Sequence, residues 1–329
     1  MNAAKPVSRF AALPKGAMLG LALFALWAVG QVFRDRALVT AWAFYLPSAV
    51  VAVLLGLLAI VAACGRRRRH AVLLLALALA PAFAVLVVEN RWRSLAKSAA
   101  PAADLRVVAW NVADFPRGVE RAAALLRPLA ADLVLLSEAP GKPPQELERQ
   151  LGGELRLTPV GSMAIFARGA PLTVEWLARE DEMQAAFVRW PVAGRTLGVL
   201  AVNLISSPRV PRDPLLARVV QMIERLAPDL VLGDFNAPRR SRALARLPVG
   251  FRHAYDDAGS GWSATWPAAL PLLAIDQTIV GPRLAVRAYS LRTTRISDHR
   301  LQLTELDFEV PPDIPPDIPP ENPPAGGSG

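Results

Sequence analysis

Three long apolar stretches open the chain, at about 16–33, 40–64 and 71–88. Each has about 18 residues or more, which is enough to cross the hydrocarbon core of a bilayer, and none carries a charge in its middle. The pattern therefore predicts a membrane anchor of three transmembrane helices over residues 1–90, with a kink at Pro47 in the second. The alternative, a cleaved signal peptide at the first stretch, is disfavoured because two more apolar stretches follow at once.

Basic residues around these stretches predict their orientation. The more basic side of a membrane protein usually faces the cytoplasm. We therefore expect a multi-pass protein of the inner or plasma membrane, with a cytoplasmic N-terminus and an extracytoplasmic domain after the third span. A nucleic-acid patch is the rival interpretation of the four-arginine run, which in so short a loop is more typical of a topology signal. The more basic side carries Lys5, Arg9, Lys15 and arginines 66–69, and the other side carries Arg34, Arg36, Arg91, Arg93 and Lys97.

Short apolar runs and amphipathic segments then alternate over residues 104–309. Strands dominate and helices punctuate them, which favours an α/β fold of two packed sheets with helices outside. A short linker at 91–103 precedes this domain, and a Pro-rich tail at 310–329, expected to be disordered, follows it. The predicted strands are about 105–110, 132–137, 162–167, 172–178, 185–190, 197–204, 229–233, 273–280, 284–291 and 301–309, and the helices about 118–130, 143–151, 214–227 and 239–246.

Polar residues suited to metal and phosphate chemistry stand at the ends of these apolar runs. Strand ends at one rim of a sheet can bring residues distant in sequence into one pocket. Carboxylates, amides and an imidazole are the groups needed for a Mg²⁺-assisted attack on phosphorus. The five strings are Trp110-Asn111, Ser137-Glu138, Gly233-Asp234-Phe235-Asn236, Ile275-Asp276 and Ser297-Asp298-His299.

Five such strings in this order resemble the endonuclease/exonuclease/phosphatase superfamily, over roughly residues 104–308. Each string alone is weak evidence. Asp256-Asp257 and Thr265-Trp266-Pro267 add support, and the membrane leader is similar to that of membrane-anchored bacterial members. The resemblance implies a four-layer αββα sandwich of two packed mixed sheets and a metal-dependent phosphoester hydrolase that uses Mg²⁺, or alternatively Mn²⁺.

Glu138, Asn111 and Asp298 are the candidate metal-side residues. Glu138 follows a five-residue apolar run, where a charged side chain must leave the core, although an ordinary strand-end carboxylate would look the same. Asn111 could position the metal or a phosphate oxygen, and Asp298 could supply a second carboxylate. By resemblance, these three residues correspond to the metal side of the family's site.

Asp234, Asn236, His299 and Asp276 are the candidate catalytic residues. Asp234 would activate the attacking water, and Asn236 would hold the water or the phosphate, although Gly-Asp-x-Asn can also be a plain Asx turn. A cationic His299 would stabilise charge on the phosphate oxygens, and Asp276 would orient its ring and raise its pKa. The alternative for His299 is a structural histidine.

Asn203 departs from the family pattern, because many members carry a histidine after the central strand. An amide can donate a hydrogen bond to phosphate but carries no positive charge. The chain could use Asn203 for neutral phosphate contact, rely on a nearby arginine, or be slow or inactive. Arg209, Arg239 and Arg240 follow two of the motif-bearing strands and are candidate phosphate-binding residues, although arginine is common throughout the chain.

Composition limits the choice of substrate. The 329 residues carry a net charge of +9 with 53% hydrophobic residues and a mean hydropathy of +0.30, and the one cysteine, Cys64, excludes an intramolecular disulfide. A tether to the bilayer favours a lipid-linked or other envelope phosphate or pyrophosphate. A nuclease is the disfavoured alternative because the domain has no basic stripe and few aromatic residues. A non-catalytic envelope binding module is a third hypothesis, and no obligate protein partner is inferred.

Overall fold

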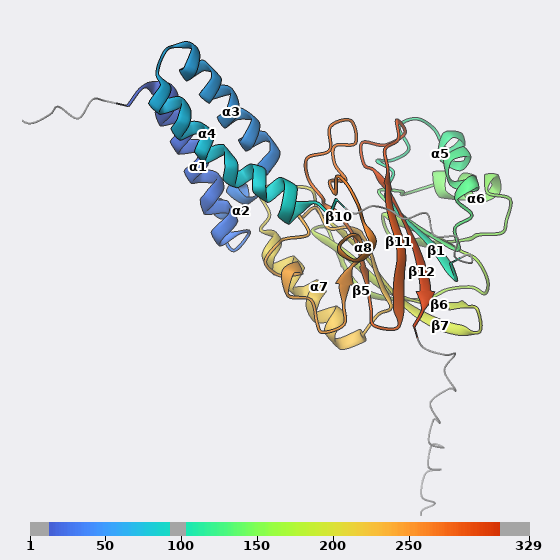
Figure 1. The fold of residues 1–329 in the computed structure, drawn as a ribbon. Helices are drawn as coiled ribbons and strands as arrows, with labels where there is room; N and C mark the ends of the chain where they lie inside the picture. The colour runs from blue at the N-terminus through green and yellow to red at the C-terminus, as the bar shows by residue number, and fades with distance from the viewer. Residues whose placement is uncertain (1–12, 93–102, 310–329) are drawn as a thin grey trace, which may run out of the picture.

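The structure is a computed structural model that describes residues 13–92 and 103–309. Figure 1 shows a group of N-terminal helices beside a sandwich of strands, with α7 (Arg212–Leu226) on the same side as the helices. Most of the predicted linker at 91–103 and the whole predicted tail at 310–329 lie outside the described residues. The predicted domain boundaries therefore stay predictions.

Two N-terminal helices are long and apolar enough to cross a membrane, and a third crossing is formed if a bent pair is counted as one span. The two are α1 and the continuous helix from Arg68 to Glu89. The bent pair, α2 and α3, changes direction by 65° at a break that contains Pro47, as the proline predicts. The bounds are α1 Lys15–Phe33, α2 Leu38–Phe44, α3 Ser48–Cys64, α4 Arg68–Phe83 and the π-helical η1 Ala84–Glu89.

A chain of polar contacts ties these helices together at one end. The Trp27 indole Nε1 donates to Ser48 Oγ at 3.0 Å, and Ser48 Oγ donates to Glu89 Oε1 at 2.5 Å. The three residues belong to α1, α3 and η1, so each buried polar atom is satisfied by another helix. The contacts fix the end of the helical group that faces the sandwich.

The first sheet has six strands in the order β11-β12-β1-β2-β4-β3. Only β1 and β2 run parallel, and the other neighbours are antiparallel, so the sheet is mixed. The bounds are β1 Leu105–Asn111, β2 Leu133–Ser137, β3 Arg156–Val160, β4 Met163–Ala167, β11 Leu284–Arg292 and β12 Leu301–Phe308.

The second sheet also has six strands, in the order β5-β6-β7-β8-β10-β9. Its parallel pair is β7–β8, and a β-strand, helix, β-strand crossover through α7 joins the two. The bounds are β5 Thr173–Glu180, β6 Met183–Val192, β7 Arg195–Leu204, β8 Leu230–Asp234, β9 Arg252–His253 and β10 Asp276–Val280.

Apolar side chains from both sheets fill the space between them, among them Leu133, Leu135, Val199 and Leu232. Each fully buried side chain of this kind stabilises the fold by roughly 1.5–3 kcal/mol. Helices cover the outer faces, with α5 (Val119–Leu126) and α6 (Pro143–Gln150) on the first sheet and α7 on the second. The predicted fold class, two packed mixed sheets with helices outside, is confirmed.

Candidate active site

Three polar residues form a row across one edge of the second sheet. Asn203 at the end of β7 lies opposite Asp234 at the end of β8, and Asp234 lies opposite Asp276 at the start of β10. Side chains directly opposite each other on neighbouring strands project from the same face. The strand register therefore assembles residues that are more than seventy positions apart in the sequence.

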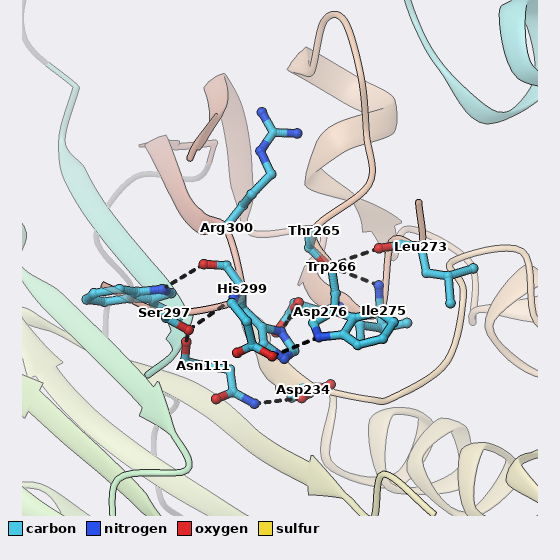
Figure 2. Close-up of polar contacts among 12 residues, drawn as sticks. Asn111, Asp234, Thr265, Trp266, Leu273, Ile275, Asp276, Ser297, His299 and Arg300 are labelled. Carbon is cyan, nitrogen blue, oxygen red and sulfur yellow. Dashed lines mark hydrogen bonds and ion pairs between the residues drawn. The ribbon is translucent and has the colours of Figure 1, made fainter. Parts of the chain in front are cut away.

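The first sheet contributes Asn111, the last residue of β1. Its Nδ2 donates to Asp234 Oδ2 at 2.9 Å, and its Oδ1 accepts from the Ala113 backbone N–H at 2.9 Å. The backbone contact fixes which way the amide points, so the NH₂ group faces the carboxylate (Figure 2). Asn111 also lies opposite Ser137 in the strand register, which puts Glu138 at the same edge.

His299 completes the group through an ion pair with Asp276. Its Nδ1 lies 2.9 Å from Asp276 Oδ2 and 3.2 Å from Oδ1. Ser297 Oγ donates to the Asn111 carbonyl at 2.7 Å and accepts from the His299 N–H at 3.0 Å, while the Trp110 indole donates to the His299 carbonyl at 3.2 Å. The imidazole is thus held in place, and its Nε2 has no hydrogen bond to any of the described residues.

Burial and mutual charge shift the two titrating groups. Burial raises the pKa of Asp234, the Asp276 carboxylate raises it further, and the result is about 7, despite the opposing effects of His299 and Asn111. Burial lowers the pKa of His299, but the charge and hydrogen bond of Asp276 outweigh it and raise that pKa to about 9. Near neutrality His299 is cationic and Asp234 is close to its midpoint, which suits a general base.

Two groups of polar side chains could hold a divalent cation. Asp234, Asp276 and His299 place one ligand atom each within 4.8 Å of one another, and all three are buried. Asp276, however, uses both carboxylate oxygens on His299. Glu138 has no hydrogen bond or ion pair to another described side chain, and the Ser137 Oγ beside it is a buried atom without a partner. A free carboxylate, Asn111 and a spare hydroxyl fit a hard cation.

Asp298 and the loop before β10 surround the His–Asp pair. The Trp266 indole donates to Asp298 Oδ2 at 3.0 Å, so one oxygen of that carboxylate is engaged. Thr265 Oγ1 accepts from the backbone N–H groups of Ile275 and Asp276, at 3.1 and 3.2 Å. The Thr-Trp-Pro string therefore positions Asp276 and Asp298, which its sequence alone did not indicate.

Asn203 and Asn236 are anchored by neighbours that the sequence did not single out. Asn203 Nδ2 donates to Ser162 Oγ at 2.8 Å, and Ser162 Oγ in turn donates to Gln184 Oε1 at 2.9 Å. Asn236 Nδ2 donates to the Leu204 carbonyl at 2.8 Å, and the Asn236 N–H donates to Asp234 Oδ1 at 2.8 Å. Asn236 thus closes an Asx turn and orients Asp234.

The three candidate arginines do not contact this group. Arg239 is buried, donates to the Glu89 carbonyl at 2.8 Å and pairs with Asp256 at 3.3 Å. Arg240 donates to Gln31 Oε1 at 3.1 Å, so both face the N-terminal helices. Arg209 is exposed in the loop after β7. We predicted Arg239 and Arg240 at the rim because they follow Asn236, but their side chains contact Glu89 and Gln31 of the N-terminal helices instead.

The fold and this arrangement define a class of protein. The two packed mixed sheets carry a buried carboxylate whose pKa is near neutrality and a cationic imidazole oriented by a second carboxylate. Oxygen ligands for a cation lie nearby. These are the parts of a metal-dependent phosphoester hydrolase.

Sequence and structure comparisons agree with that class. The profile of the Endonuclease/Exonuclease/phosphatase family matches residues 108–299, more than half of the chain, so the chain belongs to this family, whose members are divalent-metal-dependent phosphoester hydrolases. No curated protein sequence matches the chain significantly.

Solved structures share the fold at low identity. A humanized TDP2 from D. rerio is 18% identical with a TM-score of 0.53, and covers 62% of this chain and 99% of its own. An endonuclease/exonuclease/phosphatase from Bacteroides vulgatus is 19% identical with a TM-score of 0.51, at 62% and 99% coverage. A mannosyl-6-phosphatase from Bacteroides thetaiotaomicron is 15% identical with a TM-score of 0.52, at 62% and 100% coverage.

Proposed function

We propose that this protein is a membrane-anchored, Mg²⁺-dependent phosphoester hydrolase whose catalytic domain lies outside the cytoplasm and acts on a lipid-linked or other envelope phosphate or pyrophosphate. The observation that carries the proposal is the docking of the catalytic domain on the ends of apolar helices. Arg240 donates to Gln31 at the end of α1, and the Arg91 N–H donates to the Tyr255 hydroxyl at 2.7 Å just after η1.

The exposed surface of the helices supports a membrane location. Large apolar side chains on α1, α2, α3 and α4 face outward, and Val32, Val39 and Val61 are 74%, 82% and 68% exposed. A contiguous apolar surface of this kind is unfavourable in water and is covered by lipid in membrane proteins. The bilayer is the natural partner for it.

The contacts of the two helix ends support an odd number of crossings. The loop after α1 and Arg91 after η1 both contact the catalytic domain, while the α3–α4 turn lies at the far end of the helices (Figure 1). The four arginines at 66–69 lie at that far turn. Three crossings therefore leave the arginine-rich turn cytoplasmic and the catalytic domain outside.

The chain's own residues divide the reaction between them. Asp234 accepts the proton of a water that attacks phosphorus, because it is the buried carboxylate with a pKa near neutrality. His299, cationic and fixed by Asp276, stabilises the negative charge that develops on the phosphate oxygens as the P–O bond breaks. Asn111 and Asn236 hold Asp234 in position, and Asn203 offers a neutral contact beside it.

Glu138, Asn111 and Asp298 are the residues proposed to hold the metal. A bound Mg²⁺ would act as a Lewis acid on the phosphate. Asn111 belongs both to this set and to the Asp234 hydrogen bond, so the proposed metal side and the base share one amide.

A lipid-linked substrate suits a site tethered at the bilayer surface, because confinement raises the effective concentration of substrates that live there. Nuclease action is the second hypothesis. The solved structures that share the fold include a D. rerio TDP2 complexed with single-strand DNA product and a mannosyl-6-phosphatase, so the fold does not choose between the two. The candidate arginines Arg239 and Arg240 contact the N-terminal helices and not the site, which favours the first.

The test is turnover by the purified full chain in nanodiscs with Mg²⁺. Substrates are a short-chain lipid pyrophosphate, a generic aryl phosphodiester and plasmid DNA. We expect lipid pyrophosphate to be hydrolysed fastest, and Asp234→Asn, Glu138→Ala and His299→Ala each to lose roughly 10²-fold or more in kcat. Asp181→Asn, an exposed carboxylate without a described partner, is the matched control and keeps full activity.

Two outcomes would contradict the proposal. Plasmid cleavage without lipid turnover would identify a nuclease. A fully active Asp234→Asn variant would remove Asp234 from its role as base, whatever the substrate.

A further inference from the structure

Eight arginines and one acidic residue line two adjoining hollows between the N-terminal helices and the catalytic domain. The hollows have volumes of about 450 and 440 Å³ and share Arg34 and Ala245 in their linings. We call them together the junction groove. Its charged lining residues are Arg34, Arg36, Arg91, Arg239, Arg240, Arg242, Arg246 and Arg252, with Asp256.

Ion pairs neutralise part of this charge and leave a definite excess. Arg242 pairs with Asp213 at 2.8 Å, and Arg239 and Arg91 share Asp256 at 3.3 and 3.8 Å. Arg240 has only a 3.9 Å ion pair, with Glu89, and Arg252 pairs with Asp257 and Glu309. A final group of three has no ion pair to any described residue: Arg34, Arg36 and Arg246.

The buried neighbours respond to this positive field. Burial lowers the pKa of Arg240, and the cations of Arg34 and Arg239 lower it further although Glu89 opposes them. Burial and Arg239 likewise lower the pKa of His253, which lines the groove, to about 4. A concave surface of like charges at this spacing is stabilised by an anion.

Apolar side chains rim the groove on the side of the helices. Val32 and Phe33 of α1 line one hollow, Val88 of η1 lines the other, and Val32 and Phe33 are 74% and 49% exposed. An anion that enters here meets arginines at its charged end and a lipid-facing apolar surface beside it.

We propose that the junction groove binds the phosphate headgroup of an anionic membrane phospholipid, with the acyl chains lying along α1 and η1, and that Arg34, Arg36 and Arg246 are its main phosphate contacts. The guanidinium group recognises phosphate through a planar fork of donors. The proposal rests on the proposed membrane anchorage. The site is separate from the Asp234–His299 group, so it binds lipid without hydrolysing it.

The charge excess alone would also suit nucleic acid or free phosphate. A lipid is favoured because Arg34 and Arg36, which have no ion pair among the described residues, follow directly after α1, where a membrane-spanning helix would leave the hydrocarbon core. Nucleic acid would have to approach the same arginines past the lipid-facing helices. These two alternatives become separate arms of the test.

The experiment measures thermal stabilisation of the detergent-purified full chain. Dioctanoyl phosphatidylglycerol, the probe, is titrated against dioctanoyl phosphatidylcholine, inorganic phosphate and a single-stranded oligonucleotide. We expect phosphatidylglycerol alone to raise Tm in a saturable way. The triple variant Arg34→Gln/Arg36→Gln/Arg246→Gln should bind it at least about tenfold more weakly.

The matched control is Arg67→Gln/Arg68→Gln/Arg69→Gln, which removes three arginines at the opposite end of the helices and should bind like the parent. Hydrolysis of a soluble aryl phosphodiester by the Arg34→Gln/Arg36→Gln/Arg246→Gln variant shows that this variant is folded. The same assay on the parent tests the proposed catalytic activity separately from lipid binding. Equal stabilisation by phosphatidylcholine, by phosphate or by the oligonucleotide would overturn the lipid assignment. Equal loss in both triple variants would overturn the site.

Discussion

The pair Asp234 and His299 holds opposite charges in a buried space, and each shift depends on Asp276. Burial is the main cause of the raised pKa of Asp234, and the Asp276 carboxylate raises it further by repulsion, while the same carboxylate raises the pKa of His299 by attraction. The reactive state, with Asp234 deprotonated and His299 protonated, therefore exists in the window between the two pKa values. Asp276 raises the upper pH limit of this window, because it keeps the imidazole charged at pH values well above the ordinary histidine pKa of about 6.5.

The pH dependence of kcat/KM follows from these directions. Because the base must lose its proton, activity should rise with pH through about 7, or lower when a bound cation depresses the pKa of Asp234. Because the imidazole must keep its proton, activity should fall through about 9. His299→Gln, which cannot ionise, should lose the alkaline limb and keep the acid limb. An unchanged alkaline limb in that variant would contradict the role of His299.

Glu138 carries the prediction about the metal. Its half-buried carboxylate has no described side-chain partner, so Mg²⁺ should find it available, and binding should raise Tm by a few degrees at concentrations well above Kd. Glu138→Gln should lose most of this rise, measured by calorimetry with and without a chelator. Glu175→Gln, an exposed carboxylate on β5, should keep it. If Mg²⁺ raises the Tm of Glu138→Gln as much as that of the parent, the metal would be assigned to Asp234, Asp276 and His299 instead.

Residue types at strand ends were sufficient to predict the central group but not its contacts. The structure brings together Asn111, Asp234, Asp276 and His299. Asn111 and Asp234 end β1 and β8, whereas Asp276 begins β10 and His299 precedes β12, and these strand termini share one rim. Short strings say nothing of side-chain direction, so the roles of Ser162 and of the Arg239 contacts could not be predicted. The predicted catalytic and metal roles themselves stay predictions until the variants are measured.

At the scale of elements, long apolar runs were predicted well and short or polar elements poorly. The strand β3 was missed because its residues alternate little and include Pro159. The predicted helix at 239–246 is only a short 3-10 turn at Leu244–Arg246, since its arginines contact the helical region instead of presenting one apolar face. The strand predicted from 273 begins at Asp276, because Leu273 pairs with Trp266 in an isolated bridge.

Gly233 shows how one backbone position controls the rim. It lies in β8 just before Asp234 with φ at +142°, a conformation that side chains rarely adopt, and an added Cβ would overlap the Val202 carbonyl oxygen on β7. Gly233→Ala should therefore lower the free energy of unfolding by about 3 kcal/mol or more and displace Asp234, with loss of activity. Denaturant unfolding and kcat measure the two effects.

Gly194 provides the control for that substitution. Its φ of +74° is also strained for alanine, but an added Cβ would meet nothing within 4 Å. Gly194→Ala should cost only about 1–2 kcal/mol and leave kcat unchanged. Equal costs at the two positions would mean that backbone strain alone, without the contact to β7, accounts for Gly233.

At the scale of the whole molecule, the helices and the catalytic domain meet through buried polar contacts. Asp35, which is 2% exposed, accepts from the Arg242 N–H at 2.7 Å, and the Ser263 N–H donates to Asn90 Oδ1 at 2.7 Å. Breaking such contacts would leave buried groups unsatisfied. The proposed anchor therefore does more than tether: it sets the orientation of the active site relative to the bilayer.

That orientation makes the predicted topology testable with the chain's single cysteine. Cys64 is exposed at the end of α3, beside the four-arginine turn, and Ser290 is exposed on β11 of the catalytic domain. With the catalytic domain outside, a membrane-impermeant maleimide added to spheroplasts should label Cys64→Ser/Ser290→Cys and spare the parent protein. Detergent lysis should expose Cys64 in the parent. Labelling of Cys64 in intact spheroplasts would show that the catalytic domain faces the cytoplasm. An extracytoplasmic substrate would then be ruled out, because Asp234 could not reach headgroups of the outer leaflet.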